Sequence, residues 1–559
     1  MRQPILQIQN LSIGFGSENQ YRTVLHEINW ELFPNEILGI VGESGSGKSV
    51  GCFAIAGLLP AKKAKITQGK ILLEGIDLYA QTEKEWQQLR GKHIGMVFQE
   101  PMSALNPSMT CGRQIEEVLA QHTQLAKTEI KSKVLQLLEQ VKLPYPERIY
   151  QSYPHQISGG QKQRVVIAMA IACEPKILIA DEPTTALDVT VQREILDLLV
   201  EIKNKMGMSI VFISHDLSLV ANFSDRVLVM QHGKIVEQGV TQQIFQHPKE
   251  TYTKALLASK PNPNERLKRL PTIQDFLNNT PLQVSISKEE RNERLQAMEQ
   301  QAPLLEIKNV EKTYWSQVGF FGKKQAYQAV NDVSLKIYEG ETLGLVGESG
   351  CGKSTLGNLI LKLDQPQKGA IFYQGTDITQ LSNDAFRQLR KQIQVIFQDP
   401  FASLNPKLTV GKAILEPMQV HGILIKTQER KDFVIELLQK VGLQAEHFNR
   451  YPHEFSGGQR QRIGIARSIA LQPKLVVCDE SVSALDISVQ AQVLNLLNDL
   501  KDDHQFTYLF ISHDLQVVKY MSDHVAVMQQ GKIVEYNEAD VLYEQPQHPY
   551  TQKLLRAIL

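Results

Sequence analysis

The feature that most constrains this chain is an internal repeat that covers nearly its whole length. The segment GESGSGKS at 42–49 returns as GESGCGKS at 347–354, and SGGQ at 158–161 returns at 456–459. From the SGGQ segment onward, equivalent residues are 298 positions apart in every pair. Self-similarity on this scale means that one fold is built twice in one polypeptide.

The repeat sets the expected domain boundaries. A chain of 559 residues suits two domains of ordinary size, and we expect them at residues 1–258 and 304–559. Residues 259–303 are rich in Pro, Asn, Gln and charge, which predicts a linker with one helix around 288–300. Fully extended, this linker would span about 150 Å and would allow the domains to pack in almost any orientation.

Composition narrows the class of protein. Hydrophobic residues make up 42% and charged residues 21%, as in a globular protein. The 60 basic and 60 acidic side chains cancel, which argues weakly against a nucleic-acid partner. The N-terminus lacks the apolar core of a signal peptide, and no run reaches the roughly 18 apolar residues of a membrane span. If the chain serves a transporter, we expect other chains to form the pore.

The cysteines indicate a reducing compartment. They occur singly, without the C-x-x-C spacing of a zinc site and without the pattern of a disulfide framework. The five are Cys52, Cys111, Cys173, Cys351 and Cys478.

Each glycine-rich repeat follows a short apolar run, at 36–41 and 341–346, and predicts a phosphate-binding P-loop. Glycines let successive N–H groups point inward at a helix N-terminus, while the lysine and serine suit phosphates and Mg²⁺. A glycine-rich turn with an accidental lysine is the alternative, and two matches make it negligible. The predicted ATP-binding residues are Gly42, Ser44, Gly45, Gly47, Lys48 and Ser49 in the first copy, and Gly347, Ser349, Gly350, Gly352, Lys353, Ser354 and Thr355 in the second.

Two further apolar strands, at 177–181 and 475–479, end in an Asp-Glu pair. An aspartate delivered beside a P-loop suits Mg²⁺, so Asp181 and Asp479 are predicted to position the metal. The next residue points to the opposite side of a continuing strand, so Glu182 and Glu480 are candidate general bases facing the attacking water. An ordinary acidic strand end is the alternative, which the P-loops and the repeat disfavour.

Histidine and glutamine complete each set. An Ile-Ser-His-Asp segment follows each glutamate, which places His215 and His513 to contact a γ-phosphate. A lone histidine at a strand end is more often structural, but the identical spacing favours function. Gln99 and Gln398 follow short strands and are expected to reach Mg²⁺ or the nucleophilic water.

Over the whole chain except the linker, the order of the motifs resembles that of the ATP-binding-cassette (ABC) family. The motifs are the P-loop, the Q-loop, the SGGQ signature, Walker B, the D-loop (186–188 and 484–486) and the His-loop. The resemblance implies an α/β fold with two P-loop ABC nucleotide-binding domains. Each would have a mixed sheet core and a helical subdomain, and the two would pack head to tail.

The resemblance also implies that each ATP lies between one P-loop and the signature of the other domain. Both sites keep a glutamate and a histidine, and Ser481 in place of Pro183 is a small departure. Site one would combine Lys48, Ser49, Gln99, Asp181, Glu182 and His215 with Ser456, Gly458 and Gln459. Site two would combine Lys353, Ser354, Gln398, Asp479, Glu480 and His513 with Ser158, Gly160 and Gln161.

The resemblance to the ABC family further implies that an aromatic residue ahead of each P-loop stacks on adenine. Phe15 and Tyr314 are the matching positions, with Arg22 as an assisting guanidinium, and a core aromatic is the alternative for Phe15. The second copy is longer at 315–326, where Trp315, Phe320 and Phe321 predict a surface knob of unknown purpose.

Other segments indicate the branch of the family. PMSALNP at 101–107, PFASLNP at 400–406, YPH before each signature, and the terminal His-Pro…Tyr-Thr residues at 247–253 and 548–551 resemble the ATPases of oligopeptide, dipeptide and nickel importers. The fused arrangement is similar to that of a bacterial peptide importer that also takes up microcin C. The implied partners are membrane permease subunits and, through them, a solute-binding protein. The implied location is peripheral, on the cytoplasmic side of the inner (plasma) membrane.

Three related expectations follow. The apolar residues after the glutamines would receive a coupling helix of a permease. A ribosome-associated tandem ABC ATPase is the main alternative function, and the short, weakly charged linker disfavours it. A DNA-repair ABC ATPase is a second alternative, and the uninterrupted cassettes disfavour it. Cys351, in a P-loop at a helix N-terminus, would have a lowered pKa and react with thiol reagents unless it is merely a tolerated small residue.

Overall fold

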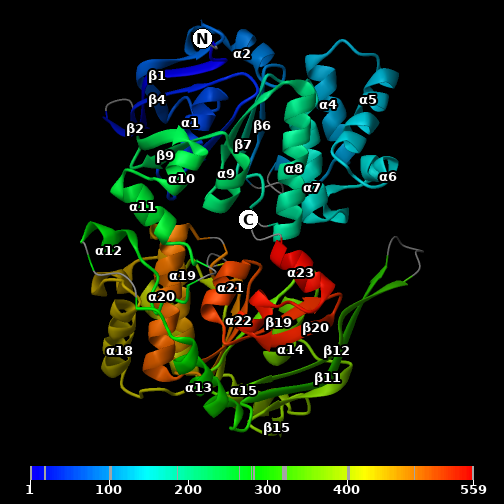
Figure 1. Ribbon diagram of the computed structural model, residues 1–559. Coiled ribbons are helices and arrows are strands. Elements are labelled where there is room, and N and C mark those ends of the chain that lie inside the picture. The colour runs from blue at the N-terminus through cyan, green and yellow to red at the C-terminus, as the bar shows by residue number, and fades with distance from the viewer. Residues whose placement is uncertain are drawn as a thin grey trace. The chain divides into compact units, whose positions relative to one another are not determined.

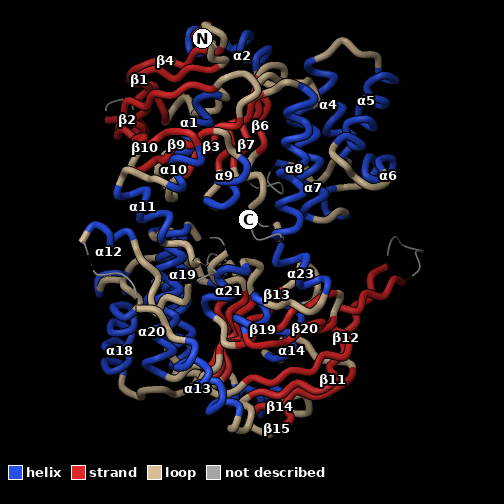
Figure 2. Tube along the Cα trace, viewed as in Figure 1, coloured by secondary structure: helices blue, strands red, loops and turns tan. Residues whose placement is uncertain are grey.

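The computed structural model describes residues 3–17, 20–99, 104–185, 187–262, 265–278, 280, 284–317, 324–399, 403–483 and 485–556. Contacts divide the chain into two units, residues 1–257 and 258–558. Figure 1 shows the chain coloured from blue to red along the sequence, and Figure 2 shows that both units combine sheets with helices.

The first unit contains two sheets. A six-stranded sheet has the order β10-β9-β3-β8-β7-β6 and is parallel except at β10, and a four-stranded antiparallel sheet has the order β2-β1-β4-β5. The central strands β3, β7 and β8 are buried along their whole length, which explains their continuous apolar sequence. The strands are β1 Leu6–Ser17, β2 Gln20–Leu32, β3 Ile37–Val41, β4 Ala64–Leu73, β5 Ile76–Asp77, β6 Ile94–Val97, β7 Ile177–Asp181, β8 Ser209–Ile213, β9 Arg226–Gln231 and β10 Lys234–Val240.

The helices of the first unit fall into two groups. Helices α4 to α7 pack on one another as a helical subdomain beside the sheets, whereas α1, α9 and α10 contact strands of the main sheet (Figure 1). The helices are α1 Lys48–Ile55, α2 Glu83–Leu89, α4 Cys111–His122, α5 Lys127–Gln140, α6 Pro146–Gln151, α7 Gly159–Ile171, α8 Val189–Met206, α9 Leu217–Phe223, α10 Thr241–Gln246 and α11 Thr251–Ala258.

The second unit repeats this topology strand for strand, with the sheets β16-β17-β18-β13-β19-β20 and β12-β11-β14-β15. Its strands are β11 Leu305–Gln317, β12 Lys324–Ile337, β13 Thr342–Val346, β14 Lys368–Tyr373, β15 Thr376–Asp377, β16 Ile393–Ile396, β17 Leu475–Asp479, β18 Thr507–Ile511, β19 His524–Gln529 and β20 Lys532–Glu538. Its helices are α14 Lys353–Ile360, α15 Asn383–Leu389, α17 Val410–Val420, α18 Thr427–Lys440, α19 Gly457–Ile469, α20 Ile487–His504, α21 Leu515–Met521, α22 Ala539–Glu544 and α23 Pro549–Arg556. The predicted α/β fold, with a mixed sheet core and a helical subdomain in each copy, is confirmed.

The segment between the copies packs on the second unit. It contains α12 Ile273–Leu277 and α13 Lys288–Glu299, the helix expected around 288–300. Leu270 is buried, and its backbone N–H and C=O both bond to the Asn495 side chain at 2.8 Å. Arg291 on α13 is almost fully buried and pairs with Asp540 and Glu538. This segment is therefore held by specific polar contacts and not only by its covalent ends.

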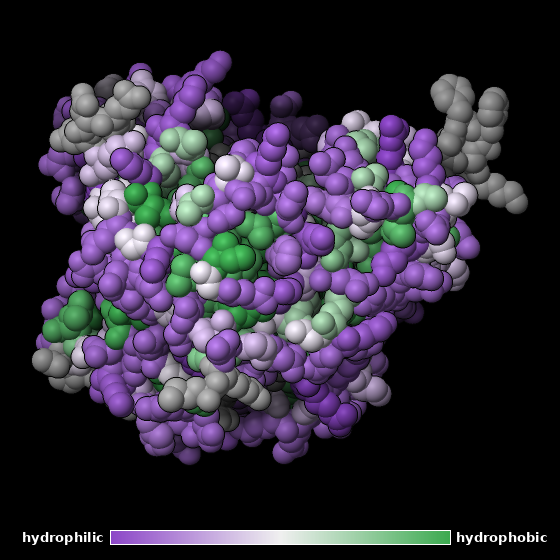
Figure 3. Space-filling view, turned by 90° about the horizontal axis from the view of Figure 1, so that it is seen from above, coloured by the Kyte–Doolittle hydropathy of each residue, from purple (hydrophilic) through white to green (hydrophobic). Residues whose placement is uncertain are grey.

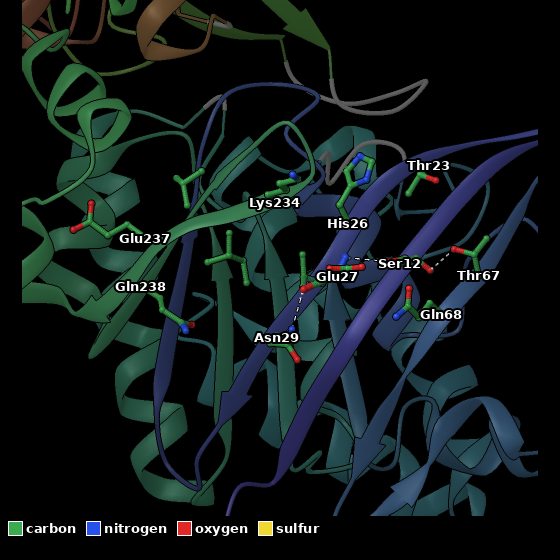
Figure 4. A pocket seen from close by; sticks show the side chains of 13 residues that line it. Ser12, Thr23, His26, Glu27, Asn29, Thr67, Gln68, Lys234, Glu237 and Gln238 are labelled. Atoms are coloured by element: carbon green, nitrogen blue, oxygen red, sulfur yellow. Dashed lines mark hydrogen bonds between the residues drawn. The ribbon is translucent and has the colours of Figure 1, made fainter. Parts of the chain in front are cut away.

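The antiparallel sheet of the first unit has a polar hollow of about 770 Å³ on one side, lined from β1, β2, β4 and β10 (Figure 4). Hydrogen bonds across its floor join the strands: Glu27 N–H donates to Ser12 Oγ at 3.0 Å, and Thr67 Oγ1 donates to the Ser12 carbonyl at 3.2 Å. These side chains stabilise the sheet that carries Phe15.

Among the described residues, no helix combines the length and the apolar character that crossing a bilayer requires. On the face shown in Figure 3, hydrophobic side chains lie in small groups among hydrophilic ones. At the tip of the β11–β12 ribbon, Trp315 is 65% exposed, while the other members of the expected knob, Phe320 and Phe321, lie outside the described residues.

Candidate active sites

A buried strand leads into each glycine-rich loop, and a helix leaves it. In the first unit β3 ends at Val41, the loop follows, and α1 begins at Lys48. Gly42 and Gly47 have φ angles of 145° and 102°, and a Cβ at Gly42 would lie 2.2 Å from the Met230 carbonyl oxygen. Only glycine fits this turn, because a side chain would be strained by the backbone and would collide with β9.

The P-loop lysines are held over their own loops. Lys48 is 7% exposed, and its Nζ donates to the carbonyls of Gly42 at 2.8 Å and Glu43 at 2.9 Å. Lys353 makes the same two contacts in the second unit, at 2.7 and 3.1 Å. A positive charge fixed beside inward-facing amides at a helix N-terminus is the arrangement that binds a chain of phosphates.

A hydroxyl and a carboxylate face each other beside each lysine. Ser49 Oγ lies 3.4 Å from Asp181 Oδ1, and Ser354 Oγ lies 3.1 Å from Asp479 Oδ1. Burial raises the pKa of Asp181 to about 6, the Ser49 hydrogen bond opposes this rise, and the Glu182 charge adds to it. Burial likewise raises the pKa of Asp479.

These residues fit Mg²⁺. Burial raises the pKa of both carboxylates although the nearby lysines oppose the rise, and a divalent cation would add further positive charge there. Hydroxyl and carboxylate oxygens are the hard ligands that Mg²⁺ prefers, and Mg²⁺ is usually held by few protein oxygens plus the phosphates of the substrate.

The sequence suggested that the glutamates that follow lie on a continuing strand, but in the structure they do not. β7 ends at Asp181 and β17 at Asp479, and the next residues, Glu182 and Glu480, have left-handed φ angles of 48° and 46°. The Glu182 N–H donates to the Ile213 carbonyl at 3.0 Å, which anchors this turn. A left-handed non-glycine residue costs about 1–2 kcal/mol, and such strained residues cluster at functional sites.

Three side chains converge on one oxygen of Glu182. Gln99 Nε2 donates to Oε2 at 3.0 Å, Thr185 Oγ1 donates to it at 2.9 Å, and His215 Nδ1 lies 3.0 Å from it. Burial alone would raise the pKa of Glu182, but the hydrogen bonds from His215 and Thr185 and the nearby charges of His215 and Lys48 lower it to about 2. The carboxylate is therefore held ionised, as a proton acceptor must be before it acts.

The second unit repeats this arrangement with one difference. Gln398 Nε2 donates to Glu480 Oε2 at 2.7 Å, and His513 Nδ1 lies 3.5 Å from the same oxygen. Ser483, at the position of Thr185, donates instead to the backbone carbonyl of Glu480 at 2.9 Å. The hydrogen bond from His513 lowers the pKa of Glu480 and outweighs its burial.

Each signature segment begins a helix; its serine is exposed, and the three residues that follow range from exposed to half-buried. Ser158 caps α7 by accepting from the Gln161 N–H, and Ser456 caps α19 by accepting from the Gln459 N–H. In the described part of the chain, a Cβ on Gly457 would meet no atom within 4 Å.

The second signature glycine has a role inside its own unit. A Cβ on Gly160 would lie 2.8 Å from Val191, and one on Gly458 would lie 2.3 Å from Val489. Close helix packing therefore selects glycine there, a reason that the sequence did not reveal.

The two aromatic positions differ. Phe15 is half-buried and packs against the hydrophobic core, whereas Tyr314 is 39% exposed and its hydroxyl donates to Asp364 Oδ2 at 2.8 Å. Tyr327, opposite Tyr314 on β12, bonds through its hydroxyl to the Gly350 carbonyl of the P-loop. Sequence reasoning missed this tyrosine because its strand pairing is a tertiary feature.

Burial changes the expectation for Cys351. Cys351 is 7% exposed, and burial raises the pKa of its thiol although Lys353 lowers it, so the predicted lowered pKa is wrong. The predicted coupling-helix segments fall largely on 100–103 and 400–402, which lie outside the described residues, as do Ala186 and Ala484 of the D-loops.

Comparison with known proteins identifies the family. The family described as "ABC transporter" matches residues 25–185 and 330–483, which contain both P-loops and both Asp-Glu pairs. The chain belongs to the ABC transporter family. The family "Oligopeptide/dipeptide transporter, C-terminal region" matches 236–283 and 534–559, the ends of the two repeats.

Curated relatives match almost the whole of this chain and most of their own length. The chain is 45% identical over 565 residues to the glutathione import ATP-binding protein GsiA of Shigella sonnei. The aligned residues cover 99% of this chain and 89% of that relative. The protein of the same name from Escherichia coli K12 gives the same values. A solved dimeric ATP-binding cassette bound to ADP and Pi is 28% identical and covers 42% of the chain and 98% of the cassette, with a TM-score of 0.38.

These findings establish the biochemical class. The chain is an ABC-type ATPase that binds ATP with Mg²⁺ and energises an importer of the oligopeptide/dipeptide type. They give no support to the ribosome-associated alternative.

Proposed function

We propose that the chain powers the uptake of short peptides or peptide-like compounds, with glutathione as the first candidate. The observation that carries this proposal is the oligopeptide/dipeptide region, which closes both repeats, in a chain that matches glutathione import ATPases along its full length. The membrane partners would be permease subunits, and a solute-binding protein would deliver the substrate to them. The chain itself would lie on the cytoplasmic face of the inner membrane.

Each cassette would use its own residues in the same way. The loop amides with Lys48 or Lys353 would bind the phosphates. Mg²⁺ would be held by Ser49 with Asp181, or by Ser354 with Asp479, and would supply positive charge to the phosphates.

Glu182 and Glu480 orient the attacking water and accept its proton. Gln99 and His215 in the first unit hold Glu182 ionised until ATP binds, after which His215 can turn to the γ-phosphate. The geometry that supports these roles is the convergence of Gln99 and His215 on one carboxylate oxygen.

Each site would be completed by the signature of the other unit. Ser456, Gly458 and Gln459 would close the site of Lys48, and the segment beginning at Ser158 would close the site of Lys353. The support for this pairing is that both signature serines are exposed and cap the N-termini of helices, where backbone amides favour a phosphate.

The pairing is tested by cross-linking in the full chain. In a C173S/C351S background, which removes the one half-buried cysteine and the one in a P-loop, cysteines are placed at Ser44 and Ser456. The first P-loop has serine at the position equivalent to Cys351, so the C351S substitution introduces a residue that the other repeat already uses there. A short bifunctional thiol reagent should link S44C to S456C only with ATP present, and should not link S44C to S158C in the same unit. ATP-dependent linkage of the second pair alone would contradict the pairing.

The transported substrate is tested by reconstitution. Membrane vesicles containing the permease subunits and this chain should accumulate labelled glutathione or dipeptides when ATP and the solute-binding protein are present. The double variant K48A/K353A should abolish uptake, because neither site can hold the phosphates. Uptake that persists in this variant, or its absence for every short peptide tested, would contradict the proposal.

A further inference from the structure

Each repeat ends with a short helix whose tyrosine touches the P-loop of the same unit. Tyr550 on α23 is 7% exposed, and the Glu348 N–H donates to its hydroxyl oxygen at 3.0 Å. Tyr252 on α11 is 6% exposed, and the Glu43 N–H donates to its hydroxyl oxygen at 3.3 Å. The same contact is thus built twice, between segments more than 200 residues apart.

The residue that each tyrosine contacts also holds the P-loop lysine. The Glu348 carbonyl accepts from Lys353 Nζ at 3.1 Å, and the Glu43 carbonyl accepts from Lys48 Nζ at 2.9 Å. One residue of the loop therefore bonds to the tyrosine through its N–H and to the lysine through its C=O. A shift of this residue would move the lysine and the neighbouring amides together.

In both copies, the same hydrogen bonds orient the tyrosine toward the P-loop. Glu535 on β20 accepts from the N–H groups of Gln547 and His548 at 2.8 and 3.0 Å, which fixes the start of α23. Glu237 on β10, at the edge of the hollow in Figure 4, makes the equivalent contacts before α11. The helix that carries the tyrosine is thereby tied to the edge strand of the main sheet.

We propose that Tyr252 and Tyr550 are positioning residues for nucleotide binding, which give the terminal region of the oligopeptide/dipeptide type a direct role at the phosphate site. Their hydroxyls hold the loop in the conformation in which its amides and lysine receive phosphates. A loop ordered in advance loses less conformational freedom on binding, so affinity rises. This role depends on each P-loop alone and does not rest on the pairing of the two units or on the transported substrate.

The test compares two tyrosines of the same terminal region. Tyr543 also lies within residues 534–559, and its hydroxyl donates to the Leu515 carbonyl at 2.5 Å, away from the P-loop. Y550F and Y543F each remove a single hydroxyl group from a tyrosine, so the two changes are matched in size and chemistry. Both are made in the full chain with K48A, so that binding reports mainly on the second site.

The measurement is the equilibrium dissociation constant for a fluorescent ATP or ADP analogue, together with Tm without nucleotide. Y550F should weaken binding by about two- to tenfold, the range expected for one hydrogen bond, and Y543F should leave affinity unchanged. The reciprocal variant, Y252F in a K353A chain, should weaken binding at the first site.

A lowered Tm with unchanged affinity in Y550F would overturn the proposal, because it would mean that the hydroxyl only stabilises the fold. Equal loss of affinity in Y550F and Y543F would overturn it as well, since any buried hydroxyl of the region would then have the same effect. Loss of affinity in Y550F alone supports it.

Discussion

At the scale of single residues, the two catalytic centres are close copies that differ in how the glutamate is held. Thr185 donates to the carboxylate of Glu182, whereas Ser483 donates to the backbone of Glu480. His215 also lies closer to its glutamate, at 3.0 Å against 3.5 Å for His513. The carboxylate of the first unit therefore has one more hydrogen-bond donor than its counterpart in the second.

Replacing Thr185 with valine should change the pH dependence of hydrolysis. Loss of the hydroxyl removes a hydrogen bond that lowers the pKa of Glu182, so this pKa should rise from about 2. Glu182 must be ionised to accept a proton, and the acid limb of the kcat profile should therefore move to higher pH. We expect kcat near neutral pH to fall by about tenfold, which corresponds to the lower end of the range for a hydrogen bond to a charged group, about 1.5 kcal/mol.

The matched control is S483A, which removes a hydroxyl that contacts only backbone in the second unit. Its profile should keep the wild-type shape. The measurement is steady-state ATPase activity from acid to neutral pH. An acid limb that moves equally in both variants would argue against the role of Thr185.

At the scale of structural elements, the segment that follows the first repeat behaves as part of the second unit. Besides Arg291, this segment places Arg294 against the buried Asp523 and Arg266 against Asp540 at 3.1 Å. Lys501, itself buried, approaches Asp523 from α20 at 3.0 Å. The segment thus provides counter-charges for carboxylates that burial would otherwise destabilise.

Arg291→Met should strongly destabilise the second unit. The substitution leaves the half-buried carboxylates of Asp540 and Glu538 with one cation fewer, although Asp540 keeps Arg266 and Lys519. We therefore expect a cost of about 3 kcal/mol, the lower end of the range for removing one partner of a buried pair. K288M is the control on the same helix, since Lys288 pairs with Glu544 at the surface and exposed pairs contribute about 0–1 kcal/mol.

Both variants are measured by urea unfolding of the full chain, followed by hydrogen exchange in β19 as a probe of the second unit. Equal stability of R291M and K288M would show that the segment is only loosely attached.

The stability of the second unit should also depend on His524. Burial alone would lower the pKa of this histidine, but the hydrogen bond and charge of Glu341, with Asp523 and Glu299, raise it. Below about pH 6.5, the pKa of an unfolded histidine, the imidazolium–carboxylate contacts contribute fully. That contribution is lost as pH rises through the raised pKa of the folded state.

Hydrogen exchange in β19 should therefore show weaker protection as pH rises above neutral, after correction for intrinsic exchange. The first unit contains a natural control: Arg226 occupies the equivalent position and pairs with Glu36 at 3.1 Å, and arginine stays charged over this range. Protection in β9 should not follow the same trend. A flat response in β19, or no change of slope in H524Q, would contradict this prediction.

At the scale of the whole molecule, two cassettes in one chain raise the question of whether the sites act together. In E182Q and E480Q the phosphates and Mg²⁺ keep their contacts, so ATP binding should be preserved. If each site is completed by the other unit, either single variant should lose far more than half of the turnover. A general base contributes about 10²–10⁴ in rate.

Measurement of kcat and of ATP affinity in both single variants and in the double variant decides this point. Half of the wild-type rate in each single variant would show that the sites work independently. Wild-type rates would contradict the assignment of the two glutamates.

The sequence alone determined the repeat, the α/β fold and the family, because these depend on motifs that are local. A glycine-rich turn between a strand and a helix, or an Asp-Glu pair at a strand end, is written in consecutive residues such as those around Lys48 and Asp181. Identical spacing in two copies then removed the chance alternatives.

Tertiary structure decided the contacts between segments far apart in the chain. The left-handed backbone at Glu182, the approach of Thr185 to its carboxylate, and the reach of Tyr252 to the P-loop depend on how strands and helices pack, which no local spacing encodes. Burial likewise decided the pKa of the Cys351 thiol, because the exclusion of water raises this pKa. This effect outweighs the lowering that the sequence led us to expect from the helix N-terminus.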